Sequence, residues 1–146
     1  MPNLTLGPIA HSKFKPGPPN DLAQTASQFL LETLANSSIL PLEELCILEG
    51  HFAWSLYADL VCLNYDGNIL DASLKALIAA LRATKVPKAH TIHMENDEFK
   101  LEINAEDKSS LKLGSLPTCC TVGIFDNKLL LDPTVEEEEM LSLIHI

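Results

Sequence analysis

The sequence predicts an α/β (α+β) fold in which helices pack on a mixed sheet, and three patterns support this prediction. Residues 22–34 and 69–83 carry apolar side chains at helical spacing, whereas residues 53–63 alternate between two faces as a strand does. Shorter apolar stretches bounded by turn residues follow and are expected to be strands. The helix at residues 69–83 is apolar on nearly every side, so it needs cover on several faces. Few strands are available to cover it, a pattern typical of part of a larger assembly.

Composition limits the classes of function open to this chain. Its 146 residues suffice for one domain with a core but not for two. The 20 acidic residues outnumber 10 lysines and arginines, a formal charge of −10, so we expect no binding to RNA or an anionic membrane by the chain alone. Aromatic residues make up 5% of the chain, which disfavours a module that stacks RNA bases on aromatic side chains.

Targeting signals and cysteine spacing indicate the compartment. No secretory signal or membrane span is visible, because Pro8 interrupts the start and the longest apolar run, residues 74–81, is too short. The cysteines lie in apolar stretches without CxxC spacing, which is typical of free thiols in a reducing compartment. They are Cys46, Cys62, Cys119 and Cys120. We therefore expect a soluble nuclear or cytosolic protein with no membrane partner.

The first helix is predicted to follow a proline-rich segment that contains no acids and two lysines, Lys13 and Lys15. Asp21 with Gln24 three residues later fits a capping box, and "ANSS" ends the helix because Asn and Ser prefer local hydrogen bonds. One stripe of this helix is apolar. It comprises Leu22, Ala26, Phe29, Leu30 and Leu34.

The strand at residues 53–63 is expected to present two faces, because successive side chains of a strand point to opposite sides. One face comprises Trp54, Leu56, Ala58, Leu60 and Cys62. The other comprises Ser55, Tyr57, Asp59, Val61 and Leu63. Asp59 is the one charged residue in the strand, and we expect it to hydrogen-bond near a sheet edge or an interface.

The turn Asp66-Gly67-Asn68 places acids where a strand meets a helix, which is a common position for catalytic carboxylates. Asp66 suits a turn because its carboxylate accepts hydrogen bonds from backbone N–H groups ahead of it, and Gly67 suits the positive-φ position. Asp71 lies in the first helical turn, where the helix dipole stabilises a carboxylate by roughly 0.3–1 kcal/mol. Structure therefore explains both acids, and we favour this interpretation over a catalytic pair.

Short strands are predicted in the second half of the chain, at residues 90–94, 99–103 and 118–125. A hairpin turn at Asp126-Asn127 leads from the last of these into residues 128–132. An acidic tail follows this hairpin.

Two groups of residues superficially resemble metal sites. His90 and His93 lie near Glu95 and Asp97, but strand alternation points the two histidines to opposite faces. The run Glu136–Glu139 is expected to be a solvated face, because a metal site needs ligands fixed in geometry. We therefore expect no metal and no cofactor.

Four stretches carry the pattern of a known family. "FKPGPPND" is similar to the family's entry into its first helix, and "WSLYADLVCL" and "YDGNILDA" are similar to the strand and corner that follow. "GIFDNKLLLDPTVEEEE" is similar to its later hairpin. The family is the RNase PH-like subunits of the RNA exosome ring, in their non-catalytic branch.

The likeness implies an incomplete RNase PH-like domain. It covers roughly residues 2–139, so we expect a partial domain over residues 1–139 and a divergent or truncated tail over residues 140–146. Family members carry N-terminal strands and a C-terminal helix that we expect to be missing here.

The resemblance also concerns catalysis, because active RNase PH relatives use phosphate to release nucleoside diphosphates from RNA 3′ ends. They carry two aspartates in the late hairpin, and the matching positions here are Asp132 and Glu138. They also place arginines, which bind phosphate bidentately, before the first helix. This chain has Lys13 and Lys15 there, and its one arginine is Arg82. We therefore expect no catalytic residue, no enzyme activity and no small-molecule substrate.

The resemblance implies a non-catalytic structural subunit of the exosome ring that supports 3′-to-5′ RNA processing and degradation, including ribosomal RNA maturation. The implied partners are other RNase PH-like ring subunits, cap subunits, and RNA through the assembled ring, in the nucleus, the nucleolus and the cytoplasm. Lys13 and Lys15 are candidate RNA contacts, although two solvated loop lysines are the simpler interpretation. The alternatives are a phosphorolytic 3′-to-5′ exoribonuclease that uses Asp132 and Glu138, or a non-functional fragment.

Overall fold

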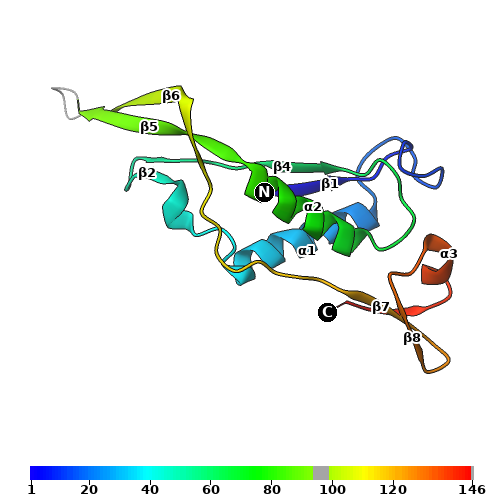
Figure 1. Cartoon of the computed structure of the whole chain (residues 1–146). Coiled ribbons are helices and arrows are strands. Elements are labelled where there is room, and N and C mark those ends of the chain that lie inside the picture. The colour runs from blue at the N-terminus through cyan, green and yellow to red at the C-terminus, as the bar shows by residue number, and fades with distance from the viewer. Residues whose placement is uncertain (94–98, 146) are drawn as a thin grey trace.

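A computed structural model of the chain, which describes residues 1–93 and 99–145, contains a helical body and two projecting hairpins (Figure 1). Strands β1 (Pro2–Thr5) and β4 (Ala58–Val61) pair in parallel, and helices α1 (Asp21–Ser37) and α2 (Ile69–Ala83) lie on one side of them. The other elements are η1 (Leu42–Leu45), β2 (Cys46–Leu48), β3 (Phe52–Ala53), β5 (Lys85–His93), β6 (Phe99–Ser110), β7 (Thr121–Phe125), β8 (Lys128–Leu131), α3 (Val135–Glu138) and β9 (Ser142–His145).

The predicted α/β (α+β) class is confirmed. Its parallel and antiparallel pairings are distributed over four small sheets: β1-β4, β2-β3, β5-β6 and β8-β7-β9. No helix of the described residues is long and apolar enough to cross a membrane.

Helix α1 begins one residue before the position that a capping box at Asp21 requires. The side chain of Asn20 accepts a hydrogen bond from the backbone N–H of Ala23 at 2.8 Å, so Asn20 is the N-cap and the predicted capping box is wrong. The helix ends within "ANSS", as predicted, because Ser38 adopts a left-handed conformation with φ of 51°.

Two buried clusters form the core, and helix α1 contributes to both. One cluster lies between β1, the corner after β4 and the first turns of α1, and contains Leu4, Leu6, Ala10, Phe14, Ala23, Ala26, Cys62, Tyr65 and Ile69. The other joins the two helices and contains Leu30, Ile39, Leu74, Leu77 and Leu81. Leu22, at the edge of the predicted apolar stripe, is 36% exposed.

Helix α2 has the predicted bounds but buries fewer faces than predicted. Its buried apolar residues form one stripe, whereas Ala72, Ala76 and Ala80 are exposed to solvent. The prediction of burial on several faces is therefore wrong for this chain by itself, because no described strand covers the alanine face.

The predicted strand at residues 53–63 divides into β3 and β4. Strand β1 supplies partners for four residues only, from Pro2 paired with Ala58 to Thr5 paired with Val61, and a strand persists only where a neighbour completes the ladder. The predicted alternation of faces is confirmed, since Leu60 and Cys62 point inward whereas Asp59 is exposed. As expected for a charged residue at a sheet edge, Asp59 accepts a hydrogen bond from Asn3.

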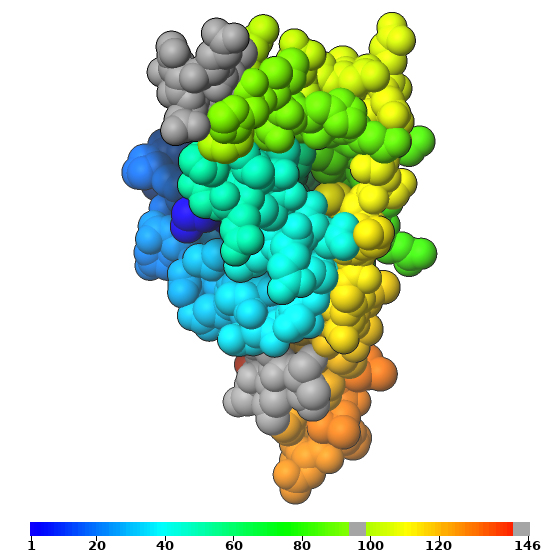
Figure 2. Space-filling view, turned by 90° about the vertical axis from the view of Figure 1, so that its left-hand side faces the viewer, coloured from blue at the N-terminus to red at the C-terminus, as the bar shows by residue number. Residues whose placement is uncertain are grey.

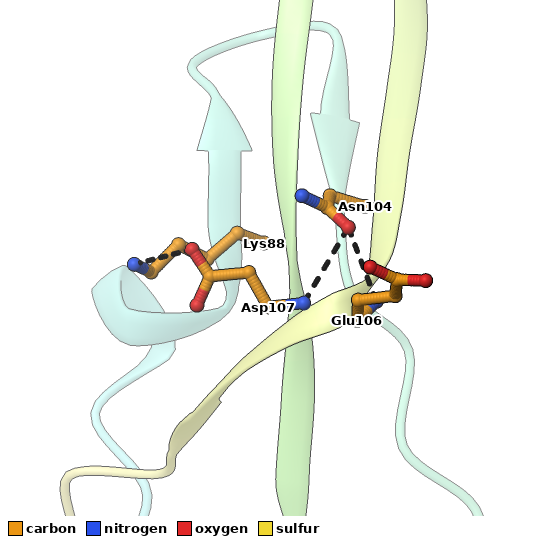
Figure 3. Close-up of polar contacts among 4 residues, drawn as sticks. All are labelled: Lys88, Asn104, Glu106 and Asp107. Carbon is orange, nitrogen blue, oxygen red and sulfur yellow. Dashed lines mark hydrogen bonds and ion pairs between the residues drawn. The ribbon is translucent and has the colours of Figure 1, made fainter.

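The β5–β6 hairpin is longer than the two predicted strands and projects from the body (Figure 1). Its register shifts between Pro87 and Lys88, where Asn104 accepts hydrogen bonds from the backbone N–H groups of Glu106 and Asp107 (Figure 3). Lys88 pairs with Asp107 at 2.8 Å across this irregularity. Both side chains are about half exposed, so the pair contributes only about 0–1 kcal/mol to stability.

The β7–β8 hairpin turns at Asp126-Asn127, as predicted, and both turn residues have positive φ. Strand β7 begins at Thr121, later than the predicted start at residue 118, and β9 pairs with its other edge. In Figure 2 this hairpin (orange) and the β5–β6 hairpin (green to yellow) lie at opposite ends of the molecule.

Candidate nucleic-acid interface beside an acidic corner

The corner between β4 and α2 is held against the segment that follows β8. Gly67 has φ of +88°, and a Cβ atom on it would lie 2.4 Å from the carbonyl oxygen of Pro133, so only glycine fits. Asn68, the N-cap residue of α2, also has a left-handed φ of 47° and makes no side-chain cap hydrogen bond. Its amide is therefore available to residues elsewhere in the chain.

Asn68 forms hydrogen bonds with three acids, of which one lies in the first turn of α2 and two lie in the segment after β8. Its Nδ2 donates to Oδ1 of Asp132 and, at 3.3 Å, to Oδ2 of Asp71. Its backbone N–H donates to Oε1 of Glu138 at 2.7 Å. The structure thus brings Asp132 and Glu138 to one corner, where Asn68 engages both.

Asp71 is an anchor between α2 and β7. Its side chain is buried, with 4% of the residue exposed, and it accepts hydrogen bonds from the hydroxyl (2.8 Å) and the backbone N–H (3.0 Å) of Thr121. Burial raises the pKa of Asp71, but hydrogen bonds from Cys119, Thr121 and Asn68 outweigh burial, so the pKa lies below its ordinary value. Asp71 therefore stays ionised and has the structural role predicted for it.

Tyr65 connects Glu138 to the basic loop, which we define as residues 11–20. The Tyr65 hydroxyl donates to Oε2 of Glu138 at 3.1 Å, and 4% of the residue is exposed. Burial, together with the negative charge of Glu138, raises the pKa of Tyr65, so the phenol remains a donor. On the ring, Nζ of Lys13 lies 4.3 Å from the centroid, and it lies 5.5 Å from the centroid of Phe14.

The two predicted RNA-contact residues differ in how they are held. Lys13 and Lys15 are both exposed, and both line a shallow pocket of about 290 Å³ that also contacts Phe14 and Asn20. In the described part of the chain, only Lys13 of the two makes a ring contact, and neither forms an ion pair. Among the described residues, Lys13 is therefore in contact with two aromatic rings, whereas Lys15 is in contact with none.

Residues 1–93 and 99–145 contain no group of three or more His, Cys, Asp or Glu side chains that could hold a metal ion. His93 packs on Phe99 with ring centroids 5.0 Å apart. His90 instead lines a pocket that also contacts Trp54 and that His93 does not line. Glu95 and Asp97 lie outside the described residues.

The glutamate run is only partly the solvated face that was predicted. Glu136 and Glu139 are exposed, but Glu137 completes a capping box with Thr134, and Glu138 is bound at the corner. The physical reason is that the short helix α3 directs two of its three acids, Glu137 and Glu138, toward specific donors.

Sequence reasoning missed Tyr65 and Asn68. A signal for Asn68 was present, because Asn after Gly in a turn tolerates positive φ and its amide is then free to bind elsewhere. Its partners could not be predicted, because Glu138 is 70 positions away.

Two segments of the chain match the 3′ exoribonuclease family: domain 1 over residues 1–87 and domain 2 over residues 115–146. The chain belongs to the 3′ exoribonuclease family. Within it, Tyr65 and Asn68 lie in the domain 1 segment, whereas Asp132 and Glu138 lie in the domain 2 segment. The acidic corner is therefore a contact between the two family domains.

Relatives in this family include exosome components. The exosome complex component rrp43 of Schizosaccharomyces pombe is 45% identical over 141 residues, which are 96% of this chain and 51% of the relative. The exosome complex component Rrp42 of Methanothermobacter thermautotrophicus is 35% identical over 142 residues, 97% of this chain and 51% of the relative. The predicted resemblance to exosome ring subunits, and within them to ribosomal RNA-processing protein 43, is confirmed.

A solved structure has the same fold. It is the Archaeoglobus fulgidus exosome with RNA bound to the active site, which matches with a TM-score of 0.77 and 31% identity over 98% of this chain and 54% of that chain. The chain thus spans about half the length of the curated relatives it matches.

Proposed function

We propose that this chain is a non-catalytic structural component of the RNA exosome ring, which supports 3′-to-5′ processing and degradation of RNA, including maturation of ribosomal RNA. Its proposed partners are other RNase PH-like ring subunits, the cap subunits, and RNA in the assembled ring. The names of the curated relatives support this assignment. We propose the nucleus, the nucleolus and the cytoplasm as its locations.

The main support for a non-catalytic role is that Asp132 and Glu138 are both hydrogen-bonded at the corner between β4 and α2. Glu138 uses both carboxylate oxygens to accept hydrogen bonds, from Tyr65 and from the backbone of Asn68. Asp132 accepts from the Asn68 amide. These bonds hold both acids against Asn68 and Tyr65, one at a single oxygen of Asp132 and two at the oxygens of Glu138, which supports a structural role for the pair.

The cations near the corner also favour a structural role. Lys13 and Lys15 are the candidate RNA contacts, and neither provides the planar fork with which arginine binds a phosphate at two points. Arg82, the one arginine of the chain, lies in the last turn of α2, away from the corner. The site can therefore attract a phosphate backbone without holding a phosphate in line for attack.

Co-expression with the other exosome ring subunits, followed by native mass spectrometry, tests the proposed role. We expect one copy of the chain in each ring. A full-length family member expressed in the same way is the control for assembly. Exclusion of this chain from rings that accept the control would contradict the proposal. Aggregation with and without partners would favour the alternative of a non-functional fragment.

The alternative function, a phosphorolytic exoribonuclease, makes a separate prediction. Rings that contain the chain as their one candidate active subunit should release nucleoside diphosphates from RNA only if phosphate is present. Under our proposal, no such release occurs, and Asp132→Ala changes nothing in the assay. Phosphate-dependent release that Asp132→Ala abolishes, but Glu136→Ala leaves intact, would establish the enzyme instead.

A further inference from the structure

Three residues form a connected path from the domain 2 segment to the basic loop. Glu138 accepts from the Tyr65 hydroxyl at 3.1 Å, and the ammonium of Lys13 lies 4.3 Å from the centroid of the Tyr65 ring. Glu138 and Lys13 therefore contact the same aromatic side chain, one at its hydroxyl and one at its ring.

Tyr65 is held in place at its backbone, its hydroxyl and its ring. Its backbone N–H donates to the carbonyl of Ala10 at 2.9 Å, which ties the residue just before the basic loop to the corner. Its ring packs edge-to-face on Phe14, with ring centroids 5.2 Å apart, and both residues are buried. The ring is therefore a rigid platform for a side chain that would otherwise move freely in solvent.

Glu138 has little freedom to reorient. One carboxylate oxygen accepts from Tyr65, and the other accepts from the backbone of Asn68 at 2.7 Å. A hydroxyl that donates to a carboxylate is held strongly, because charge-assisted hydrogen bonds are about twice as strong as neutral ones. The negative charge behind the phenol also increases the attraction of the ring for a cation on its face.

We infer that Glu138 and Tyr65 are positioning residues: Glu138 fixes Tyr65, and Tyr65 holds the Lys13 ammonium at the rim of the basic-loop pocket. The importance of this arrangement for RNA rests on the proposed function, whereas the arrangement itself does not. A held ammonium meets an arriving phosphate without first losing side-chain freedom. Lys15, which contacts no aromatic ring of the described residues, is the adaptable cation of the pair.

Nuclear magnetic resonance of the full chain with ¹³C-labelled lysine tests the positioning directly. Protons above an aromatic ring resonate upfield, so we expect the ε-methylene of Lys13, and not that of Lys15, to be shifted upfield. Tyr65→Phe keeps the ring and should retain most of the shift. Tyr65→Leu should remove most of the upfield shift of Lys13 and leave only the part that the Phe14 ring causes. Tyr57→Leu, which removes an exposed tyrosine, should change neither lysine.

The role of Glu138 is tested with a matched pair of variants. Glu138→Ala should reduce the upfield shift of Lys13, whereas Glu136→Ala, which removes an exposed acid of the same short helix, should leave it unchanged. If Tyr65→Leu fails to fold, the comparison of Glu138→Ala with Glu136→Ala still decides the question. A Lys13 methylene that already matches Lys15 in the unaltered chain would overturn the inference.

A second measurement separates this inference from the proposed function. In reconstituted rings, the yield of RNA crosslinked to Lys13 should fall with Tyr65→Leu and be restored by Tyr65→Phe. Unchanged crosslinking in all variants would overturn the role of Tyr65 in RNA contact. Failure of the chain to enter rings would contradict the proposed function, whereas the resonance measurements on the chain would still test the positioning.

Discussion

Asn68 reaches three acids because its backbone is left-handed and its side chain does not cap helix α2. The side-chain amide and the backbone N–H are therefore available for other hydrogen bonds. The amide contacts Asp71 and Asp132, and the backbone N–H contacts Glu138. The bonds to Asp132 and Glu138 cross between the two family domains. A well-formed hydrogen bond to a charged acceptor is worth about 1.5–3 kcal/mol, so Asn68 stabilises the contact between the domains.

The close approach at Gly67 gives the first prediction at this scale. Gly67→Ala should lower the free energy of unfolding by roughly 1–3 kcal/mol, because it adds a steric conflict with Pro133 to the cost of positive φ. Gly50→Ala is the matched control, since Gly50 has φ of +77° with nothing within 4 Å of an added Cβ. Denaturant titration of both variants measures the difference, and equal losses would contradict the steric conflict.

The lowered pKa of Asp71 gives a pH-dependent prediction. Because the folded-state pKa lies below the ordinary value of 3.8, the stabilisation is complete above that value and is lost as pH falls through the folded-state pKa. Asp71→Asn should lower the free energy of unfolding by about 1–3 kcal/mol at neutral pH, and the deficit should shrink in acid. Urea titrations over a pH series measure it, with Asp66→Asn as the exposed control. A deficit that stays constant into acid would contradict the assignment.

At the scale of elements, the two long helices were predictable and the strands were less so. Helix α2 has the bounds that its apolar spacing and the preceding turn predicted, because both signals are local to residues 66–83. The start of α1 was misplaced by one residue because Asn20 and Asp21 are both good caps, and only the structure decides between them. The strand at residues 53–63 was predicted too long because its length depends on β1, which is distant in sequence.

The β5–β6 hairpin is expected to be the least protected long element. Strand β6 is exposed along residues 102–110, and a two-stranded hairpin with little cover is marginal in water. Its backbone amides should therefore exchange with deuterium faster than those of α1 and α2. Exchange mass spectrometry of the chain measures this, and equal protection in β5 and α2 would contradict the expectation.

At the scale of the whole molecule, exposed apolar surface favours assembly with a partner. An apolar hollow of about 710 Å³ runs between β4 and α2, and Tyr57, Val61 and Leu63 beside it are exposed. Exposed apolar surface of this extent is typical of proteins that bind partners. The candidate site was only partly predictable, because Lys13 and Lys15 could be found as an acid-free pair, whereas Tyr65 became relevant only through the fold.

The formal charge of −10 leads to a prediction about RNA binding. The chain alone should show no measurable affinity for single-stranded RNA at physiological salt, because two lysines neutralise few phosphates and the remaining field is repulsive. In rings that contain the chain, Lys15→Ala should weaken binding and reduce the slope of log affinity against log salt by up to about 1. Fluorescence anisotropy over a salt series measures both, and tight binding by the chain alone would contradict the charge argument.

The distance along the chain between Asn68 and Glu138, 70 positions, also sets a schedule for synthesis. A ribosome adds about 5–20 residues per second, so the corner emerges roughly 4–14 s before the glutamate that binds it. During that interval helix α2 can form from local contacts, whereas the turn at Gly67 and Asn68 still lacks its hydrogen bonds to Asp132 and Glu138. The segment that contains Asp132 and Glu138 therefore completes a junction that Gly67 and Asn68 begin.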